Sequence, residues 1–469
     1  MIRKTIAQIA LLALSALPGS GTAQDVDAVR PAETAQASAE WLSQPADGDK
    51  APGVGGRINQ RYHVGQANAV LASFDLVSRL SGSPAGIADV TADDALYGAS
   101  SLTFTPSSTA TTQVRPAAAR APVDVRGQII RWWVKGGQDA NARLGTFSIR
   151  LYSAGSPSSP GANYHVYAAG GDVKTAMGNG ETRWMSFSAS PAAFTAVGTG
   201  ADLSAITFAV VDMAAASTTS QMILRFGNVE VVPNGIAKAK FIVAFDDMYP
   251  QTVQYASRVM ARYGFRAMLY PSSLITLGQG GKLTVPMVKN LHDNLGWQIA
   301  SQAWSTENNV GAGGIDLMTN DQRTAEMAKL RNMQNALGLT GGAHGSYFSN
   351  VGVADMIAYP MFRQHFRSMR AYYFGPVPPE TFPWGDPMRI KAQGAGEFQY
   401  NSDADLFTNR WKPYIDSAIA QKGVAFLVFH GGLNSAGVSW QSSFDAMMAY
   451  LDAQRANIDV VTVDDLEMP

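Results

Sequence analysis

The stretch Phe241-Ile242-Val243-Ala244-Phe245-Asp246-Asp247-Met248-Tyr249-Pro250 has two adjacent carboxylates directly after an apolar run. A short apolar run bounded by polar and turn residues is typical of a buried strand, most often in a parallel sheet. Aspartates at the carboxyl end of such a strand lie where α/β folds place ligands and chemistry. Adjacent carboxylates repel each other, so a cation, a donor or a shared proton must relieve them. In the alternative interpretation, one aspartate caps the next helix and the other is solvated.

The residues after this strand predict a βαβ unit. Residues 251–263 carry apolar side chains at helical spacing, and Gly264 is expected to end that helix. Residues 265–270 then predict a second strand. A strand, an acidic turn, a helix and a second strand form a crossover unit, which is expected to be right-handed.

The strand that ends in Phe-Asp-Asp resembles the first motif of the polysaccharide deacetylase family, also called the NodB-homology or carbohydrate esterase 4 fold. The resemblance extends over residues 239–469 and implies a distorted parallel (β/α) barrel. It implies that Asp246 is the general base and Asp247 a metal ligand. A late apolar run ends in His430, like the Leu-x-Leu-His of the family, and the resemblance implies that this imidazole protonates the leaving amine or alcohol.

One family motif is changed in this sequence. The family binds a divalent metal through the two histidines of His-Ser/Thr-x-x-x-His, but Gln302 and Thr306 stand at those positions. Amide and hydroxyl oxygens are weak ligands for zinc. Asp247 with these two residues could at best hold a hard cation, with help from Glu307. We therefore predict that the protein lacks stoichiometric zinc and uses no cofactor; a divalent metal at Asp247 is the disfavoured alternative.

Further residues resemble the walls of the family's groove. His344 precedes Gly345 in a stretch that resembles a groove loop, and it is the alternative to His430 as the acid. Arg370 resembles the strand arginine that orients the catalytic carboxylate. We expect Asp246 and His430 on opposite sides of one pocket, at the carboxyl ends of their strands. The predicted substrate-binding residues are Trp304, Tyr347, Asn350 and Trp384.

Short alternating runs between residues 66 and 233 are separated by Gly, Pro and Ser clusters, which is typical of a β-sandwich. This segment resembles a jelly-roll carbohydrate-binding module, and residues 234–239 are the predicted linker to the barrel. On Ile130–Val134, only one of two adjacent tryptophans can face the core. Five aromatic side chains are candidates for stacking on sugars or for packing in the core: Trp132, Trp133, Trp184, Tyr164 and Tyr167.

The first residues predict a secretory signal peptide. Arg3 and Lys4 precede an apolar run, and residues 21–23 are a small-residue cleavage site. We expect removal of residues 1–23, a flexible leader at 24–65, and a secreted or periplasmic protein without a membrane span. The absence of cysteine excludes disulfides, thiolate zinc sites and a lipoprotein anchor. A net charge of −1 gives no argument for nucleic acid.

Three functions remain open from the sequence, all with a polysaccharide or oligosaccharide as partner. The preferred one is a divergent polysaccharide deacetylase that hydrolyses N- or O-acetyl groups. The second is a lyase or glycosidase that uses the same groove without metal, with acids and bases drawn from Asp246, His344, Tyr347 and His430. The third is a non-catalytic pseudoenzyme that binds a polysaccharide.

Overall fold

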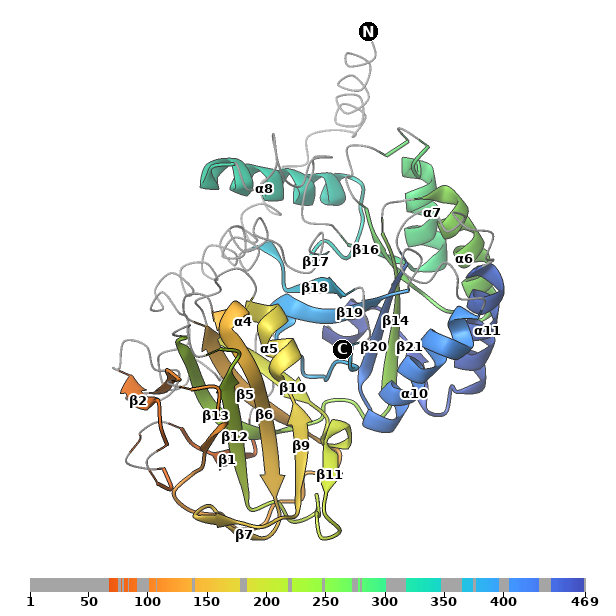
Figure 1. Cartoon of the computed structure of the whole chain (residues 1–469). Coiled ribbons are helices and arrows are strands. Elements are labelled where there is room, and N and C mark those ends of the chain that lie inside the picture. The colour runs from red at the N-terminus through yellow and green to blue at the C-terminus, as the bar shows by residue number, and fades with distance from the viewer. Residues whose placement is uncertain are drawn as a thin grey trace. The chain divides into compact units, whose positions relative to one another are not determined.

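The structure is a computed structural model (Figure 1). The predicted signal peptide (1–23) and leader (24–65) lie outside the residues that it describes and stay predictions. No helix in the described ranges is long and apolar enough to cross a membrane. The described residues are 67–74, 77, 80–82, 84–90, 101–106, 108–136, 140–177, 184–217, 222–246, 249–271, 277–278, 281–300, 318–346, 365–373, 377–395, 405–429 and 440–467.

The first sheet of the N-terminal part is antiparallel and has the order β10-β5-β13-β3-β2, with β1 paired to β13. Its strands are β1 (Ala69–Ala72), β2 (Ile87–Val90), β3 (Ser101–Phe104), β5 (Gln128–Gly136), β10 (Trp184–Ala189) and β13 (Leu224–Pro233).

The second sheet is also antiparallel, in the order β11-β9-β6-β12-β4. Its strands are β4 (Thr112–Val114), β6 (Leu144–Tyr152), β9 (Tyr164–Ala168), β11 (Thr195–Val197) and β12 (Phe208–Ala215). The smaller elements of this part are the hairpin β7 (Gly155–Ser156) and β8 (Ser159–Pro160), helices α4 (Ala140–Arg143) and α5 (Gly170–Met177), and the turn η3 (Pro191–Ala193).

The two antiparallel sheets bury one shared core. Alternate residues of β5, such as Ile130 and Trp132, pack in the same cluster as alternate residues of β6, such as Ile149 and Leu151. This period of two puts every second side chain on the inner face of its sheet. The predicted antiparallel β-sandwich is therefore present, whereas its jelly-roll order and the exact domain boundaries stay predictions.

The C-terminal part contains a sheet in which every pair is parallel. Its strands are β14 (Ala239–Asp246), β15 (Met268–Tyr270), β16 (Gln298–Ile299), β17 (His344–Ser346), β18 (Ser368–Tyr373), β19 (Ile390–Gly394), β20 (Val424–Phe429) and β21 (Ile458–Val460).

The paired strands lie in the order β16-β15-β14-β20-β19-β18-β17, and β21 pairs with β14 beside this path. Strands that are consecutive in the chain are neighbours from β14 to β16 and from β17 to β20, and β20 lies beside β14, an arrangement typical of a (β/α) barrel. The N–H of Ile299 in β16 donates to the carbonyl of Thr340, four residues before β17, at 3.0 Å. This parallel sheet fits the predicted NodB-type barrel.

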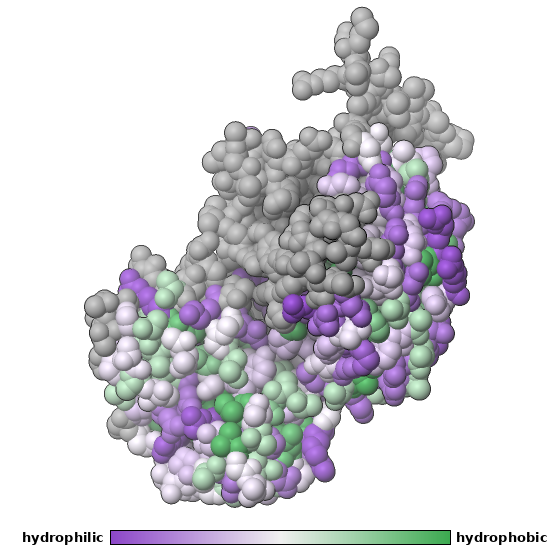
Figure 2. Space-filling model, turned by 45° about the vertical axis from the view of Figure 1, so that its right-hand side comes forward, coloured by the Kyte–Doolittle hydropathy of each residue, from purple (hydrophilic) through white to green (hydrophobic). Residues whose placement is uncertain are grey.

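Helices follow or precede most of these strands (Figure 1). The face in Figure 2 shows largely hydrophilic residues over this helical side of the molecule. As predicted, the first helix is followed by Gly264, which adopts a φ of 65°. The elements are α6 (Pro250–Arg262), α7 (Val285–Leu295), α8 (Asn320–Ala336), η6 (Pro387–Arg389), η7 (Phe407–Trp411), α10 (Lys412–Gln421), α11 (Trp440–Ala453) and α12 (Val463–Glu467).

Side chains of β14 alternate between two apolar clusters. Phe241 and Phe245 pack in a cluster with residues of α6, α10 and α11, outside the sheet. Ile242 and Ala244 belong to a second cluster with Phe426 of β20, in the interior of the barrel. Asp246 continues the inner series, so strand alternation directs its carboxylate into the barrel.

Candidate functional site

Asp246 ends β14 and is paired with a cation inside the barrel. The Nη2 of Arg370, from β18, donates to the Oδ1 of Asp246, and the two side chains are only 1% and 5% exposed. A guanidinium next to a carboxylate favours the ionised form of the carboxylate. The structure thus brings together two of the residues that the sequence predicted for the site.

Tyr270 covers the same guanidinium. The guanidinium carbon of Arg370 lies 4.3 Å from the centroid of the Tyr270 ring, within the range of a cation–π contact. Tyr270 is the register partner of Asp246 on β15. Burial raises the pKa of the Tyr270 phenol, so the phenol remains neutral near pH 7. The sequence analysis did not single out Tyr270, although it stands at the end of the second predicted strand.

The strands that lead to Asp246 and His430 are direct neighbours. β14 and β20 pair in register up to Phe245 and Phe429, which precede Asp246 and His430 in the chain. His430 itself lies outside the described residues. The expectation that Asp246 and His430 lie on opposite sides of one pocket therefore stays a prediction.

His344 occupies a different place from the one predicted. It is 1% exposed, its Nδ1 lies 2.6 Å from the Oγ of Ser368, and its Nε2 lies 2.7 Å from a carboxylate oxygen of Asp464. Asp464 belongs to α12, which follows β21, and β21 pairs with the first residues of β14. Both ring nitrogens of His344 therefore have a hydrogen-bond partner, and the ring lies at the amino end of the barrel. His344 is consequently not a candidate for the catalytic acid.

Trp384 is not available to a substrate. Its side chain is fully buried, and its indole N–H donates to a carboxylate oxygen of Glu467 at 2.8 Å. It precedes β19 and packs with Val463 and Leu466 of α12. Its predicted role in substrate binding is wrong, because the indole is buried at the amino end of the barrel.

The structure does not test several other predicted residues. Among the residues that it describes, no group of three or more His, Asp or Glu side chains could hold a metal ion. The donors at the family's metal positions are one carboxylate, one amide and one hydroxyl, a set that does not fit zinc. The residues outside the described ranges are Asp247, Gln302, Trp304, Thr306, Glu307, Tyr347 and Asn350.

The predicted sugar platforms of the sandwich are mostly buried. Trp132 is the tryptophan that faces the core, whereas Trp133 and Trp184 pack against each other and are 5% and 1% exposed. The hydroxyl of Tyr167 donates to Asp172 at 2.8 Å, and its ring packs on the core. Tyr164 is half-buried, 4.7 Å from the guanidinium carbon of Arg150. Of the five aromatic residues, the three tryptophans are buried, whereas Tyr164 and Tyr167 are only partly buried.

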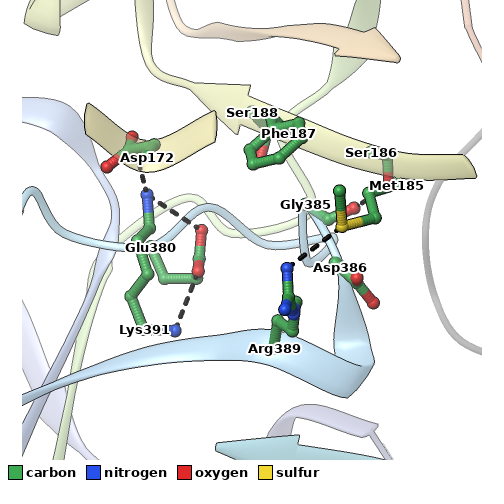
Figure 3. Close-up of a pocket in the computed structure, with 10 residues that line it drawn as sticks. All are labelled: Asp172, Met185, Ser186, Phe187, Ser188, Glu380, Gly385, Asp386, Arg389 and Lys391. Carbon is green, nitrogen blue, oxygen red and sulfur yellow. Dashed lines mark hydrogen bonds and ion pairs between the residues drawn. The ribbon is translucent and has the colours of Figure 1, made fainter. Parts of the chain in front are cut away.

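A second cluster of charges lies between β10 and the segment before β19 (Figure 3). The Nζ of Lys391 lies 3.6 Å from a carboxylate oxygen of Glu380 and 3.8 Å from one of Asp172. The cavity beside them has a volume of about 30 Å³, enough for one or two water molecules. Burial raises the pKa of Glu380, and the charge of Lys391 opposes this shift. We call these three residues the seam cluster.

Hydrogen bonds beside the seam cluster also connect the sandwich to the barrel. The hydroxyl of Ser186 donates to the carbonyl of Gly385, and the hydroxyls of Ser188 and Thr381 lie 2.6 Å apart. The predicted linker is also held by a hydrogen bond: the N–H of Gly235 donates to the carbonyl of Phe382 at 2.7 Å. No local sequence pattern indicates these contacts, since their partners lie far apart in the chain.

No protein-family model matches the sequence, and no curated protein matches it. Solved structures of carbohydrate esterase family 4 do match it. The family 4 carbohydrate esterase from Streptomyces lividans in complex with acetate has 9% identity and a TM-score of 0.32, and the match covers 48% of this chain and 93% of that chain.

Two further neighbours have similar values. The family 4 acetyl xylan esterase from Clostridium thermocellum in complex with a cobalt ion has 12% identity and a TM-score of 0.30, over 48% of this chain and 89% of that chain. A mutant of a family 4 pseudoenzyme with restored enzymatic activity has 11% identity and a TM-score of 0.33, over 49% of this chain and 68% of that chain.

Proposed function

We propose that the barrel binds an acetylated polysaccharide at the carboxyl ends of its strands and removes acetyl groups from it, with Asp246 as the general base. The observation that supports this most is the buried ion pair between Asp246 and Arg370 at the end of β14. A general base must be ionised and fixed in position before the reaction, and the guanidinium promotes both.

The proposed reaction is a hydrolysis. Asp246 takes a proton from a water molecule, and the water oxygen adds to the acetyl carbonyl carbon. The bond from that carbon to the sugar nitrogen or oxygen then breaks, and His430 gives a proton to the leaving amine or alcohol. The products are acetate and the free amino or hydroxyl group. The position of His430 directly after β20, the neighbour of β14, supports its role as the acid.

The proposal contains no metal step. The substitution of both family histidines, by Gln302 and Thr306, leaves a donor set that does not fit zinc. Stabilisation of the developing negative charge therefore has to come from side chains or backbone groups of this chain.

The replacement of the two family histidines also favours a second candidate function. A lyase or glycosidase also needs a base and an acid but no metal, and Asp246 with His430 could supply them. A barrel that only binds polysaccharide is the third outcome. We also propose that the protein is secreted after removal of residues 1–23, which N-terminal sequencing of the exported protein would test.

The function is tested by incubating the mature protein with a panel of acetylated and uronic polysaccharides. Released acetate supports the deacetylase, whereas an unsaturated uronate chromophore or new reducing ends supports the second candidate. Asp246→Asn is compared with Asp416→Asn, a matched change in an aspartate of α10. Loss of product with the first variant alone supports Asp246 as the base, and binding without any product supports the third outcome.

A further inference from the structure

Arg370 has hydrogen-bond donors that the pair with Asp246 does not use. Its Nη2 is bonded to Asp246, whereas its Nε and Nη1 are buried and have no hydrogen-bond partner among the residues that the structure describes. The side chain is 1% exposed. Charged donors that are buried without an acceptor are costly, so proteins rarely leave them in this state unless a ligand or water satisfies them.

Ser346 adds a third donor without a partner, on the strand next to Arg370. It is the register partner of Arg370 on the neighbouring strand β17, so the two side chains point to the same side of the sheet. Ser346 is fully buried, and its hydroxyl has no hydrogen-bond partner within the described ranges. With Tyr270 over it, the guanidinium of Arg370 lies in the layer of the barrel that contains Asp246.

The charge of this layer limits what the donors can bind. The carboxylate of Asp246 already balances the guanidinium of Arg370. A second anion would be repelled by Asp246, and this repulsion is strong in a buried site. An uncharged acceptor with a large dipole gains the same hydrogen bonds without that repulsion. An acyl carbonyl oxygen has these properties, whereas the carboxylate of a uronic acid does not.

We propose that Arg370 and Ser346 form a binding site for the acyl carbonyl oxygen of the substrate. This inference rests on the proposed deacetylation and names the group that the barrel recognises. When water adds to the acyl carbon, negative charge develops on this oxygen, and donors already in place stabilise it more than they stabilise the substrate. Arg370 and Ser346 thus supply the stabilisation for which no fitting metal site remains among the family's positions.

The site also distinguishes between the two catalytic candidates. A lyase that acts on uronates has to neutralise the carboxylate of its substrate, whereas the charge of Arg370 is already balanced by Asp246. An N-acetyl or O-acetyl group presents an uncharged carbonyl. The donors of Arg370 and Ser346 therefore favour an acetylated substrate over an acidic one.

The test measures binding of two small probes to the full-length mature protein by ligand-observed NMR. Acetamide presents an uncharged acyl carbonyl, and acetate has the same size with a negative charge. We expect acetamide to bind, and acetate to bind about tenfold or more weakly, because of the repulsion from Asp246. Ser346→Ala should weaken acetamide binding about five- to tenfold through the loss of one donor.

Ser346→Thr keeps the hydroxyl and should retain the affinity, which separates the donor from a general effect on folding. Ser368→Ala is the matched control, because Ser368 is also a buried serine of this sheet but is bonded to His344 instead. We expect unchanged acetamide binding for this control. Thermal unfolding of each variant verifies that it is folded under the conditions of the measurement.

Three results would overturn the inference: no acetamide binding by the wild type, equal or tighter binding of acetate, or unchanged acetamide binding in Ser346→Ala. The inference and the proposed function fail separately. If acetamide binding depends on Ser346 but no polymer releases acetate, the carbonyl-binding site is supported and the proposed deacetylation is wrong. Acetate release that does not depend on Ser346 retains the function and rejects the site.

Discussion

Arg370 donates a hydrogen bond to the carboxylate of Asp246 across 124 positions of sequence. The two residues come from β18 and β14, which are separated in the sheet by β19 and β20, so the curvature of the sheet brings their side chains into contact. Both side chains are buried. Each therefore depends on the other to offset the cost of a charge away from water.

The first prediction concerns this pair. Arg370→Met leaves the carboxylate of Asp246 buried without its cation and should lower the free energy of unfolding by about 3–5 kcal/mol. The double variant with Asp246→Asn should recover part of this loss, because an amide has no charge to compensate. Urea unfolding of the two single variants and the double variant measures the coupling. Additive effects would contradict a direct pair.

The second prediction concerns the seam cluster. Lys391→Met removes the cation beside Glu380 and Asp172 and should destabilise the protein at pH 8. Burial raises the pKa of Glu380 in the folded protein above its ordinary value of 4.5. Its contribution to stability therefore falls as the pH rises from the unfolded pKa to the folded pKa.

Removal of Lys391 should raise the pKa of Glu380 further, since the cation lowers it in the wild type. The loss of stability in Lys391→Met should consequently be large at pH 8 and should shrink toward pH 4.5, as Glu380 becomes protonated. Urea unfolding at both pH values measures this difference. Lys412→Met, which changes an exposed pair with Asp416, is the control and should show little effect. An equal loss at both pH values would refute the role of Glu380.

The third prediction concerns the close approach of Gly341, three residues before β17, to β16. Gly341 has a φ of 101°, and a Cβ at this position would lie 2.5 Å from the Cγ of Gln298 and 2.8 Å from the carbonyl oxygen of Ile299. Gly264 also has a positive φ, but a Cβ there would meet nothing within 4 Å. Gly341→Ala should therefore lower the melting temperature clearly more than Gly264→Ala does. Similar shifts would show that Gly341 does not lie close to Gln298 and Ile299.

The fourth prediction separates the two histidines. His344→Gln breaks contacts with Ser368 and Asp464 and should lower stability, while acetate release per folded molecule stays near the wild-type level. His430→Gln removes the proposed acid and should lower acetate release by about a hundredfold, with little effect on stability. Initial rates and thermal unfolding of both variants are the measurements. A large loss of acetate release in His344→Gln, with little loss in His430→Gln, would instead make His344 the candidate acid.

The sequence predicted those parts of the fold that depend on local patterns. The apolar run before Asp246 is a central parallel strand, the following helix is followed by Gly264 as expected, and the alternating runs before residue 234 form antiparallel sheets. These features are visible within a window of a few residues. Arg370 was also found from the sequence, because its strand resembles the family strand that carries an arginine toward the groove.

The errors concern residues whose partners come from distant segments. His344 and Trp384 stand next to glycines in turn-like stretches, but their partners Asp464 and Glu467 belong to α12, which lies 120 and 83 positions further along the chain. A single sequence does not reveal that this last helix closes the amino end of the barrel. The burial of Trp133 and Trp184 could not be predicted either, since strand alternation shows which face a residue occupies but not what covers that face.

The central claim is that the chain removes acetyl groups without a metal and with Asp246 as its base. The most direct measurement is the acetate released from acetylated polysaccharides by chelator-dialysed wild type and by Asp246→Asn. We predict that the dialysed wild type remains active and that Asp246→Asn loses about a hundredfold or more of that activity while remaining folded. Acetate release that returns only when a divalent metal is added, or equal activity of Asp246→Asn, would contradict this claim.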